Sequence, residues 1–344
     1  METTYSLSQL GWKGYFQHQL SLDDLTHFTP ARVAVAERSE LVLLTENGQQ
    51  TLLLTPSMPA MTVGDWLLLD SDNHFVRLLE RSSWLARKAA GRDSYRQLTA
   101  ANIDTAFIVS SLNQDFNLNR IERYLALVHE AGIEPVVVLT KLDLCDSAAE
   151  YINQVQALDS MLMVVTVNAT DPNSVSQLNP WIGSGNTVAF IGSSGVGKST
   201  LINSALGDAI QQTSAIRTDD AKGRHTTTSR TLHLLSSGGV LLDTPGMREL
   251  QLVDCEQGVN ETFNDIIDLA AQCKFSDCQH QNEPGCAVRA AVDSGQLDER
   301  RLHNYQKLIK EQAFNTATLS ERRAQDKSFG KMVKATMKLK KTKR

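Results

Sequence analysis

The sequence predicts a multidomain α/β protein in which a small β-barrel, a mostly parallel sheet and a helical C-terminal domain follow one another. Three observations predict this fold class. Short apolar segments separated by turn formers fill residues 31–87, strand-like and helix-like segments alternate from residue 104 to 243, and a cluster of cysteines with one histidine interrupts the helical region after residue 253. At 344 residues the chain is long enough for two or three domains.

The composition is that of an ordinary soluble globular protein, with 41% hydrophobic and 21% charged residues. The first ten residues have neither a basic start nor an apolar core, so we expect no signal peptide. The sequence has no apolar run of about 18 residues, so we expect no membrane-spanning helix. We therefore expect a cytoplasmic protein that acts as a monomer and has no membrane partner.

The net charge of −5 is unevenly distributed. Residues 331–344 carry seven basic side chains and no acidic one, whereas the other 27 basic residues face 39 acidic ones. A basic tail on an acidic body is typical of a protein that contacts a polyanion through that tail. A solvated terminus without a partner is the alternative.

The first domain is predicted to be a barrel. Residues 1–30 show no clear pattern, but five short strands are expected at 32–35, 41–45, 51–55, 65–70 and 74–79. Asn47-Gly48 between two of these segments is typical of a hairpin. So many strands in so short a stretch favour an OB-fold β-barrel, which either contacts nucleic acid or serves only as a structural platform. Residues 84–98 are expected to be a basic linker that contacts nucleic acid.

The middle of the chain has the alternation of a mostly parallel sheet. Helices are expected at 120–131 and 147–158, and strands at 104–111, 135–140, 161–167, 186–191, 230–235 and 239–243. Helices on both faces of such a sheet leave the ligand at the carboxyl ends of the strands.

A phosphate-binding loop stands between the apolar segment 187–191 and a helix-like run. It reads Gly192, Ser193, Ser194, Gly195, Val196, Gly197, Lys198 and Ser199, followed by Thr200. Glycines let the backbone N–H groups of such a loop point at phosphate oxygens, Lys198 adds a positive charge over the β- and γ-phosphates, and Ser199 offers a hydroxyl to Mg²⁺. The sequence therefore predicts a nucleoside triphosphate site.

A second phosphate-site motif, Asp243-Thr244-Pro245-Gly246, follows the apolar strand at 239–243. An aspartate at the end of a strand beside a phosphate loop can hold Mg²⁺, usually through water. The Gly246 N–H would then detect the γ-phosphate.

The base is predicted to be guanine. Thr140, Lys141, Leu142 and Asp143 end the strand at 135–140. The Asp143 carboxylate can accept from both N1–H and the exocyclic amino group of guanine, and adenine has no such donor pair. The Lys141 stem can cover the base. Thr140 stands where asparagine is more usual, and Asn168, at the end of the next strand, stands where a small serine usually lets backbone N–H groups meet the guanine O6.

The order of these motifs is unusual, because the base-reading residues precede the phosphate loop. A sheet tolerates such a circular permutation when the original termini lie close together, since each strand end keeps its position in space. The chain after the magnesium-binding aspartate is then free to continue into a C-terminal domain.

This combination of a barrel, T-K-L-D, G-S-S-G-V-G-K-S, G-R-H-T-T-T, D-T-P-G and a Cys/His cluster resembles the circularly permuted GTPases of the RsgA (YjeQ) family. The resemblance runs from about residue 31 to 323. It implies a bacterial GTPase that acts on the small ribosomal subunit late in its assembly, and it implies that the barrel and the metal-binding module contact ribosomal RNA.

Residues 223–228 lie where a mobile switch is expected. A threonine here, for which we favour Thr227, can complete the Mg²⁺ shell when the γ-phosphate is present. Met247 stands where many GTPases place a glutamine that orients the attacking water, and a thioether cannot do this. The family resemblance implies that His225 assists hydrolysis instead, and a structural or RNA-contacting role is the alternative. Gly195 replaces the asparagine of some potassium-activated GTPases, so we expect no potassium requirement.

Three thiolates and one imidazole, from Cys273, Cys278, His280 and Cys286, form a closed tetrahedral set for structural Zn²⁺. Pro284-Gly285 supplies the turn that returns Cys286 to the others. With four protein ligands, no position remains open for catalysis by this metal.

The sequence thus predicts an N-terminal extension (1–30), an OB-fold-like barrel with basic connector (31–98), a circularly permuted P-loop GTPase domain (99–252), a helical zinc-binding domain (253–323) and a basic tail (324–344). We expect a GTPase that uses Mg²⁺ and is stimulated by the small ribosomal subunit and its rRNA. A nucleotide-gated RNA-binding scaffold with vestigial hydrolysis is the alternative. An ATPase or small-molecule kinase would share the phosphate loop but would not explain Asp143.

Overall fold

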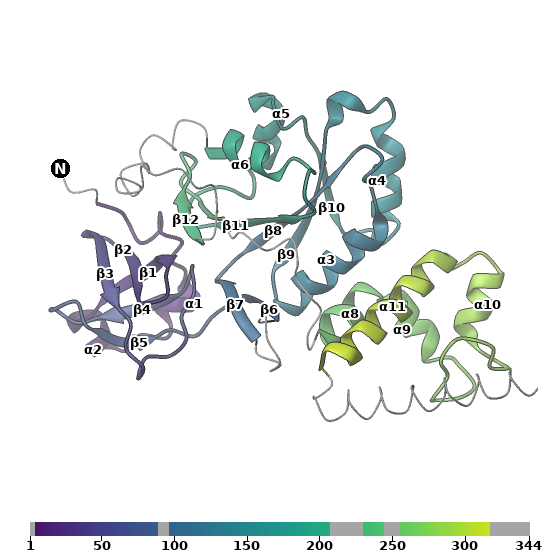
Figure 1. Cartoon of the computed structure of the whole chain (residues 1–344), viewed down its shortest axis with the longest axis horizontal. Helices are drawn as coiled ribbons and strands as arrows, with labels where there is room; N and C mark the ends of the chain where they lie inside the picture. Colours follow the sequence, from purple (N-terminus) through teal and green to yellow (C-terminus); the bar gives the residue numbers. More distant parts are fainter. Residues whose placement is uncertain (1–3, 89–95, 207–229, 244–254, 317–344) are drawn as a thin grey trace, which may run out of the picture.

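The structure is a computed structural model that describes residues 4–88, 96–206, 230–243 and 255–316. Strands of the barrel lie at one end of the molecule, a central sheet flanked by helices lies in the middle, and a separate group of helices lies at the other end (Figure 1). The predicted multidomain α/β fold class is confirmed. No helix in the described ranges is long and apolar enough to span a membrane.

The five barrel strands surround one apolar core. They are β1 (Thr29–Ala36), β2 (Glu40–Thr45), β3 (Gly48–Leu53), β4 (Trp66–Leu69) and β5 (Phe75–Leu78). Strand β1 pairs antiparallel with both β2 and β4, while β3 pairs with β2 and β5 with β4. The β2–β3 turn comes one residue earlier than expected, because Thr45 already pairs with Gly48. Gly48 has a φ of +108°. Alternate apolar side chains such as Val33, Leu43 and Leu67 fill the interior.

The N-terminal segment covers one side of this barrel. It contains α1 (Gly14–Gln17) and α2 (Leu22–His27), and Leu10 and Phe16 within it are fully buried. The Trp12 ring meets the buried Trp66 of β4 edge-on, with 4.8 Å between the ring centroids.

The central sheet carries five parallel strands in the order β10-β9-β8-β11-β13. They are β8 (Thr105–Ser111), β9 (Glu134–Thr140), β10 (Met163–Thr166), β11 (Thr187–Gly192) and β13 (Val240–Asp243). The helices of this region are α3 (Leu118–Glu130), α4 (Ala148–Gln156), α5 (Pro172–Val175) and α6 (Lys198–Leu206), with short 3₁₀ turns η1 (Leu142–Leu144) and η2 (Ser176–Leu178).

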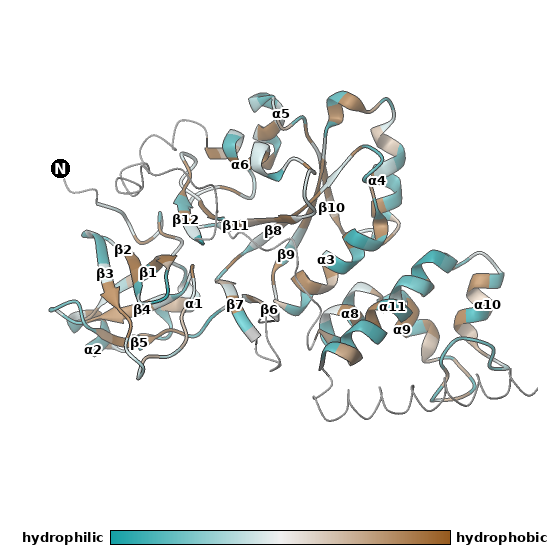
Figure 2. Cartoon of the chain, in the orientation of Figure 1, coloured by the Kyte–Doolittle hydropathy of each residue, from teal (hydrophilic) through white to brown (hydrophobic). Residues whose placement is uncertain are grey.

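Helices cover both faces of the central sheet, as expected for buried parallel strands. Successive residues of β8 belong to different cores: Phe107 packs in a cluster with Leu201 of α6, and Ile108 in a cluster with Leu125 of α3. Figure 2 shows the hydrophobic residues concentrated along these strands and hydrophilic residues on much of the helices.

The barrel and the central sheet are continuous. Strand β12 (Thr231–Leu234) runs antiparallel to β13 on one side, and Thr231 pairs with Val35 of β1 on the other. The expectation of a linker at 84–98 is wrong. Strands β6 (Trp84–Lys88) and β7 (Arg96–Ala101) form an antiparallel hairpin, because Leu85 and Ala100 are buried in the shared core and the paired backbones satisfy each other.

A fully buried arginine of β1 joins the parts of the molecule at this junction. The Arg32 guanidinium donates to the carbonyls of Leu10, Gly64 (3.4 Å) and Asn102 (3.2 Å) and to the Thr187 hydroxyl (2.9 Å). It also lies 5.4 Å from the centroid of the Trp66 ring. Burial lowers the pKa of Arg32 to about 10, opposed by nearby Asp104 and Asp65, so the group stays positive at neutral pH.

The C-terminal helices are α8 (Glu256–Thr262), α9 (Asn264–Ala270), α10 (Ala287–Asp293) and α11 (Glu299–Thr316). Helix α8 packs so closely on α3 that a Cβ on Gly258 would lie 2.0 Å from the Ala126 carbonyl oxygen. Glycine is therefore required at this helix crossing.

Replacing Arg32 with methionine should lower the free energy of unfolding by about 2–4 kcal/mol, because several buried acceptors would lose their donor. Urea unfolding followed by tryptophan fluorescence measures this. The control is Lys13→Met, which breaks the 2.7 Å ion pair with Asp104 at a partly exposed position and should cost about 1 kcal/mol or less. Equal losses in the two variants would contradict the role given to Arg32.

Candidate nucleotide site and metal centre

The phosphate loop connects the end of β11 to the first residue of α6. All three of its glycines have positive φ: Gly192 (+146°), Gly195 (+82°) and Gly197 (+95°). A Cβ on Gly192 would lie 2.4 Å from the Val109 carbonyl oxygen of neighbouring β8. The backbone thus turns at the carboxyl edge of the sheet, where only glycine fits.

Charged groups predicted to act on phosphates lie around this loop. The Lys198 ammonium donates to the Gly192 carbonyl (2.7 Å) and to the Ser193 carbonyl, so its charge lies against the loop. Asp243 ends β13, which pairs directly with β11, so its half-buried carboxylate belongs to the same sheet edge. Ser199 and Thr200, in the first turn of α6, are exposed.

The predicted base-reading motif touches the phosphate loop through Thr140. This last residue of β9 is buried, and its hydroxyl lies 2.5 Å from the Val196 carbonyl and 3.3 Å from the Ser110 carbonyl. Lys141 then adopts a left-handed conformation (φ +61°) and starts the 3₁₀ turn η1, in which the Asp143 carboxylate is exposed. The hydroxyl of Thr140 therefore makes a direct bond to the loop although asparagine is more usual there.

The segment after β10 is held beside the same edge. The N–H of Asn168 donates to the Ser174 hydroxyl (2.8 Å), and its side-chain oxygen accepts from the backbone N–H (3.0 Å) and hydroxyl (2.8 Å) of Thr170. The Ser204 hydroxyl of α6 donates to the Ala169 carbonyl (2.6 Å). Residues 140–143, 168–170 and 192–200 thus lie together at one end of the sheet.

The remaining predicted nucleotide residues, His225, Thr227 and Gly246, lie outside the described residues, as does Met247. In contrast, one side chain that the sequence analysis did not identify lies at the phosphate loop. A guanidinium nitrogen of Arg120, in α3, donates to the Ser193 hydroxyl (3.2 Å). The sequence marks position 120 only as part of an amphipathic helix, and no local pattern indicates this contact.

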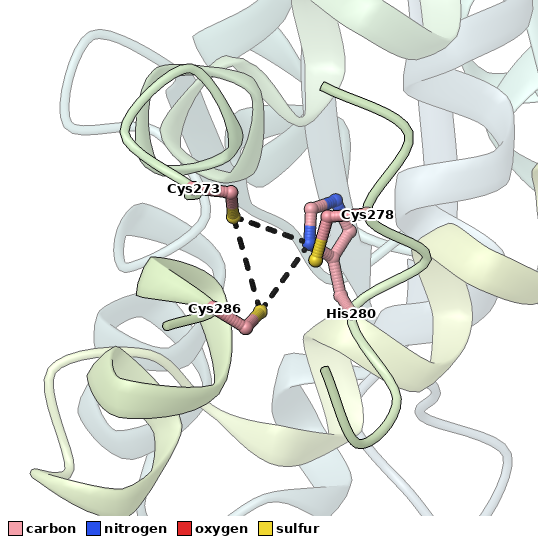
Figure 3. A group of neighbouring side chains, drawn as sticks. All are labelled: Cys273, Cys278, His280 and Cys286. Atoms are coloured by element: carbon pink, nitrogen blue, oxygen red, sulfur yellow. Dashed lines mark hydrogen bonds between the residues drawn. The ribbon is translucent and has the colours of Figure 1, made fainter. Parts of the chain in front are cut away.

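The four predicted metal ligands gather in the C-terminal domain, with all ligand atoms within 4.8 Å of one another. His280 Nδ1 lies 3.6 Å from Cys273 Sγ and 3.5 Å from Cys286 Sγ, and the two sulfurs are 3.9 Å apart (Figure 3). Ligand atoms around a tetrahedral zinc ion are about 3–4 Å apart, given bond lengths of about 2.0–2.3 Å. The group can therefore hold a metal ion, and all five cysteines of the chain are free of disulfides.

Local backbone geometry brings these ligands together. Cys273 follows α9, and Cys286 is the N-cap of α10, where its sulfur accepts the Arg289 N–H (3.4 Å). Between them the chain reverses through His280 (φ +58°) and Gly285 (φ +78°).

The pKa shifts differ among the ligand residues of the cluster. Burial lowers the pKa of His280, which leaves a neutral imidazole as ligand at neutral pH. Burial and the neighbouring thiols raise the pKa of Cys278 to about 11. Burial also disfavours the Cys273 thiolate, but hydrogen bonds from the N–H groups of Val288 and Ala287 outweigh it and lower the pKa of that thiol. A bound cation would favour the deprotonated form of every thiol in the cluster.

Comparisons with known proteins agree with this arrangement. The model of the RsgA GTPase family matches residues 78–253. A Small ribosomal subunit biogenesis GTPase RsgA 2 of Vibrio parahaemolyticus is 59% identical over 98% of this chain and 94% of its own length. The Small ribosomal subunit biogenesis GTPase RsgA of Mesorhizobium japonicum is 49% identical over 92% of both chains.

Two solved structures are similar as well. YloQ, described as a circularly permuted GTPase, superposes with a TM-score of 0.60 and 26% identity over 85% of this chain and 97% of its own. YjeQ from Thermotoga maritima has the same TM-score, with 24% identity over 83% of this chain and 98% of its own, and shows a shared fold.

Purified protein should contain one tightly bound metal ion per chain, and Cys286→Ser should lose it because a hydroxyl is a much poorer ligand than a thiolate. Elemental mass spectrometry of the folded protein measures this. Cys145→Ser, outside the cluster, is the matched control and should retain the ion. Full metal content in Cys286→Ser would contradict the assignment of that sulfur as a ligand.

Proposed function

The chain belongs to the RsgA GTPase family, and on this premise we propose that it hydrolyses GTP on the small ribosomal subunit, assists the late maturation of that subunit and leaves after hydrolysis. The names of the relatives support the ribosomal part of this proposal. The bond between the Thr140 hydroxyl and the Val196 carbonyl carries the guanine part, because it ties the base-reading segment to the phosphate loop despite the reversed chain order.

GTP would bind across the carboxyl edge of the sheet. Backbone N–H groups of residues 192–200 and the Lys198 ammonium would hold the phosphates, and the Asp143 carboxylate would accept from the guanine N1–H and amino group, with Lys141 and Leu142 beside the base. Backbone N–H groups near Asn168 would meet O6. Adenine would lack the donors that Asp143 needs, so ATP should compete poorly.

Magnesium would accompany GTP at the phosphate end of the site. We expect Ser199 and Asp243 to hold this ion, and Thr227 would join them when the γ-phosphate is present. Gly246 would detect that phosphate, and His225 would assist the attacking water in place of a glutamine. These roles rest on motif position and on the family.

Zinc is the metal that the C-terminal ligand set fits best. Three cysteine sulfurs and one histidine nitrogen form a closed set, so the ion would stabilise the domain and leave the reaction to the nucleotide site. We propose that this rigid domain and the barrel contact ribosomal RNA in the cytoplasm, and that the protein acts as a monomer.

Replacing Asp143 with asparagine should weaken GTP binding by about 100-fold or more, because the new amide offers a donor where guanine also offers one. The same variant should bind xanthosine triphosphate better than the native protein does, since xanthine carries a carbonyl in place of the amino group. Competition against a fluorescent GTP analogue measures both affinities. Asp146→Asn, exposed on the same loop, should change neither, and unchanged GTP affinity in Asp143→Asn would contradict guanine recognition at this position.

GTP turnover with and without purified small ribosomal subunits tests the whole proposal. We expect slow hydrolysis alone and a manyfold rise with small subunits, whereas His225→Ala should keep GTP affinity and lose the rise. Equal stimulation by large subunits or free RNA would argue against a subunit-specific role. The scaffold alternative would gain support if Lys198→Ala abolished nucleotide binding while His225→Ala still supported small-subunit maturation in cells.

A further inference from the structure

Arg120 spans the gap between helix α3 and the phosphate loop. It lies in the first turn of α3, where the Asn117 side chain accepts its backbone N–H (3.1 Å). Its Nη2 donates to the Asp115 carbonyl (2.9 Å), and its Nη1 donates to the Ser193 hydroxyl (3.2 Å). The guanidinium is thus aimed at the loop by its own helix cap and by the segment after β8.

Ser193 is the point at which the phosphate loop is held from two sides. Its hydroxyl accepts from Arg120, and its carbonyl accepts from the Lys198 ammonium. It directly follows Gly192, where Val109 leaves no space for a Cβ. The start of the loop is therefore fixed by β8 on one side and by Arg120 on the other.

Two residues further along α3, a buried carboxylate holds this helix to α11. The Glu122 side chain is fully buried and accepts from Arg300 (2.9 Å), Arg301 (2.9 Å) and Asn304 (2.5 Å). A displacement of α3 along α11 would leave this buried charge without its donors, which is strongly unfavourable. Arg123, one residue on, makes two bonds to Glu311 of α11, at 2.6 and 2.7 Å.

Helix α11 in turn contacts the metal-binding loop. The Gln306 side chain donates to the carbonyls of Gln279 (3.3 Å) and of the ligand residue His280 (3.4 Å). Contacts therefore run without interruption from the metal-binding loop through α11 and α3 to the start of the phosphate loop.

We propose that Arg120 is a positioning residue for the phosphate loop and that the clamp of α3 on α11 holds it in place. The inference rests on the proposed binding of guanine nucleotide. Arg120 acts through Ser193 on the shape of the loop, so it favours GDP and GTP equally and differs from a group that contacts the γ-phosphate. The C-terminal domain thereby influences nucleotide affinity from outside the site.

A double-mutant cycle on the full chain tests this. Arg120→Met and Ser193→Ala should each raise the Kd of a fluorescent GDP analogue about fivefold, the cost of one hydrogen bond to a charged group partly replaced by water. The double variant should show no further loss, because both changes remove the same contact. The loss should be equal for a non-hydrolysable GTP analogue, and the turnover of Arg120→Met at saturating GTP should be nearly unchanged.

A second pair of variants tests the clamp. Glu122→Gln should weaken GDP binding in the native background and have no added effect in Arg120→Met, because its influence passes through that side chain. Arg289→Met, which removes a charge paired with Glu299 at the exposed end of the C-terminal domain, is the control and should bind GDP as the native chain does. Thermal melting checks folding, and if Arg120→Met is unfolded, Arg120→Lys replaces it, with the same expectations.

Failure of the native chain to bind GDP would reject the proposed function itself. Native binding with unchanged affinity in Arg120→Met would overturn the positioning role alone. Additive losses in the cycle, about 25-fold in the double variant, would overturn it as well, and a loss confined to the GTP analogue would assign Arg120 to the γ-phosphate instead.

Discussion

The buried guanidinium of Arg32 is the interaction on which the relative placement of barrel and sheet depends. It is held by oxygen atoms from the N-terminal segment, the barrel, the β7–β8 connection and the first residue of β11. Strand β11 leads directly into the phosphate loop, so this cation links the barrel to the start of the nucleotide site. Apolar packing alone would tolerate sliding between the parts, whereas a buried charge with several fixed acceptors is satisfied in one arrangement only.

A second polar junction, between α3 and α11, uses the same device with opposite charge. There a buried carboxylate, Glu122, is surrounded by donors of α11. The two junctions differ in what they position: Arg32 bonds to Thr187, the first residue of β11, and Glu122 lies two residues along α3 from Arg120, which contacts Ser193. The barrel and the C-terminal helices thus both connect to the phosphate loop through short chains of directional bonds.

The circular permutation leaves the nucleotide site intact because strand neighbours in the sheet do not depend on chain order. Strands β8 and β9 precede β11 in sequence, yet all three end at one edge, where Thr140 of β9 bonds to the loop after β11. The rearranged connections change the route of the chain outside this edge. They allow the chain after β13 to continue into helices that pack on α3.

The sequence by itself determined the features that short stretches of chain encode: the glycine pattern of the phosphate loop, the alternation of strands and helices, the metal-ligand spacing and the fold class. The tertiary structure alone decided the pairing of residues 84–88 with 96–101, the burial of the N-terminal segment against Trp66, and the partners of Arg32, Arg120 and Glu122. Glycine turns and helical periodicity depend on neighbours in sequence, so they are visible locally. A buried charge or an irregular segment is stabilised by groups about 20–180 residues away, and no local pattern records which groups those will be.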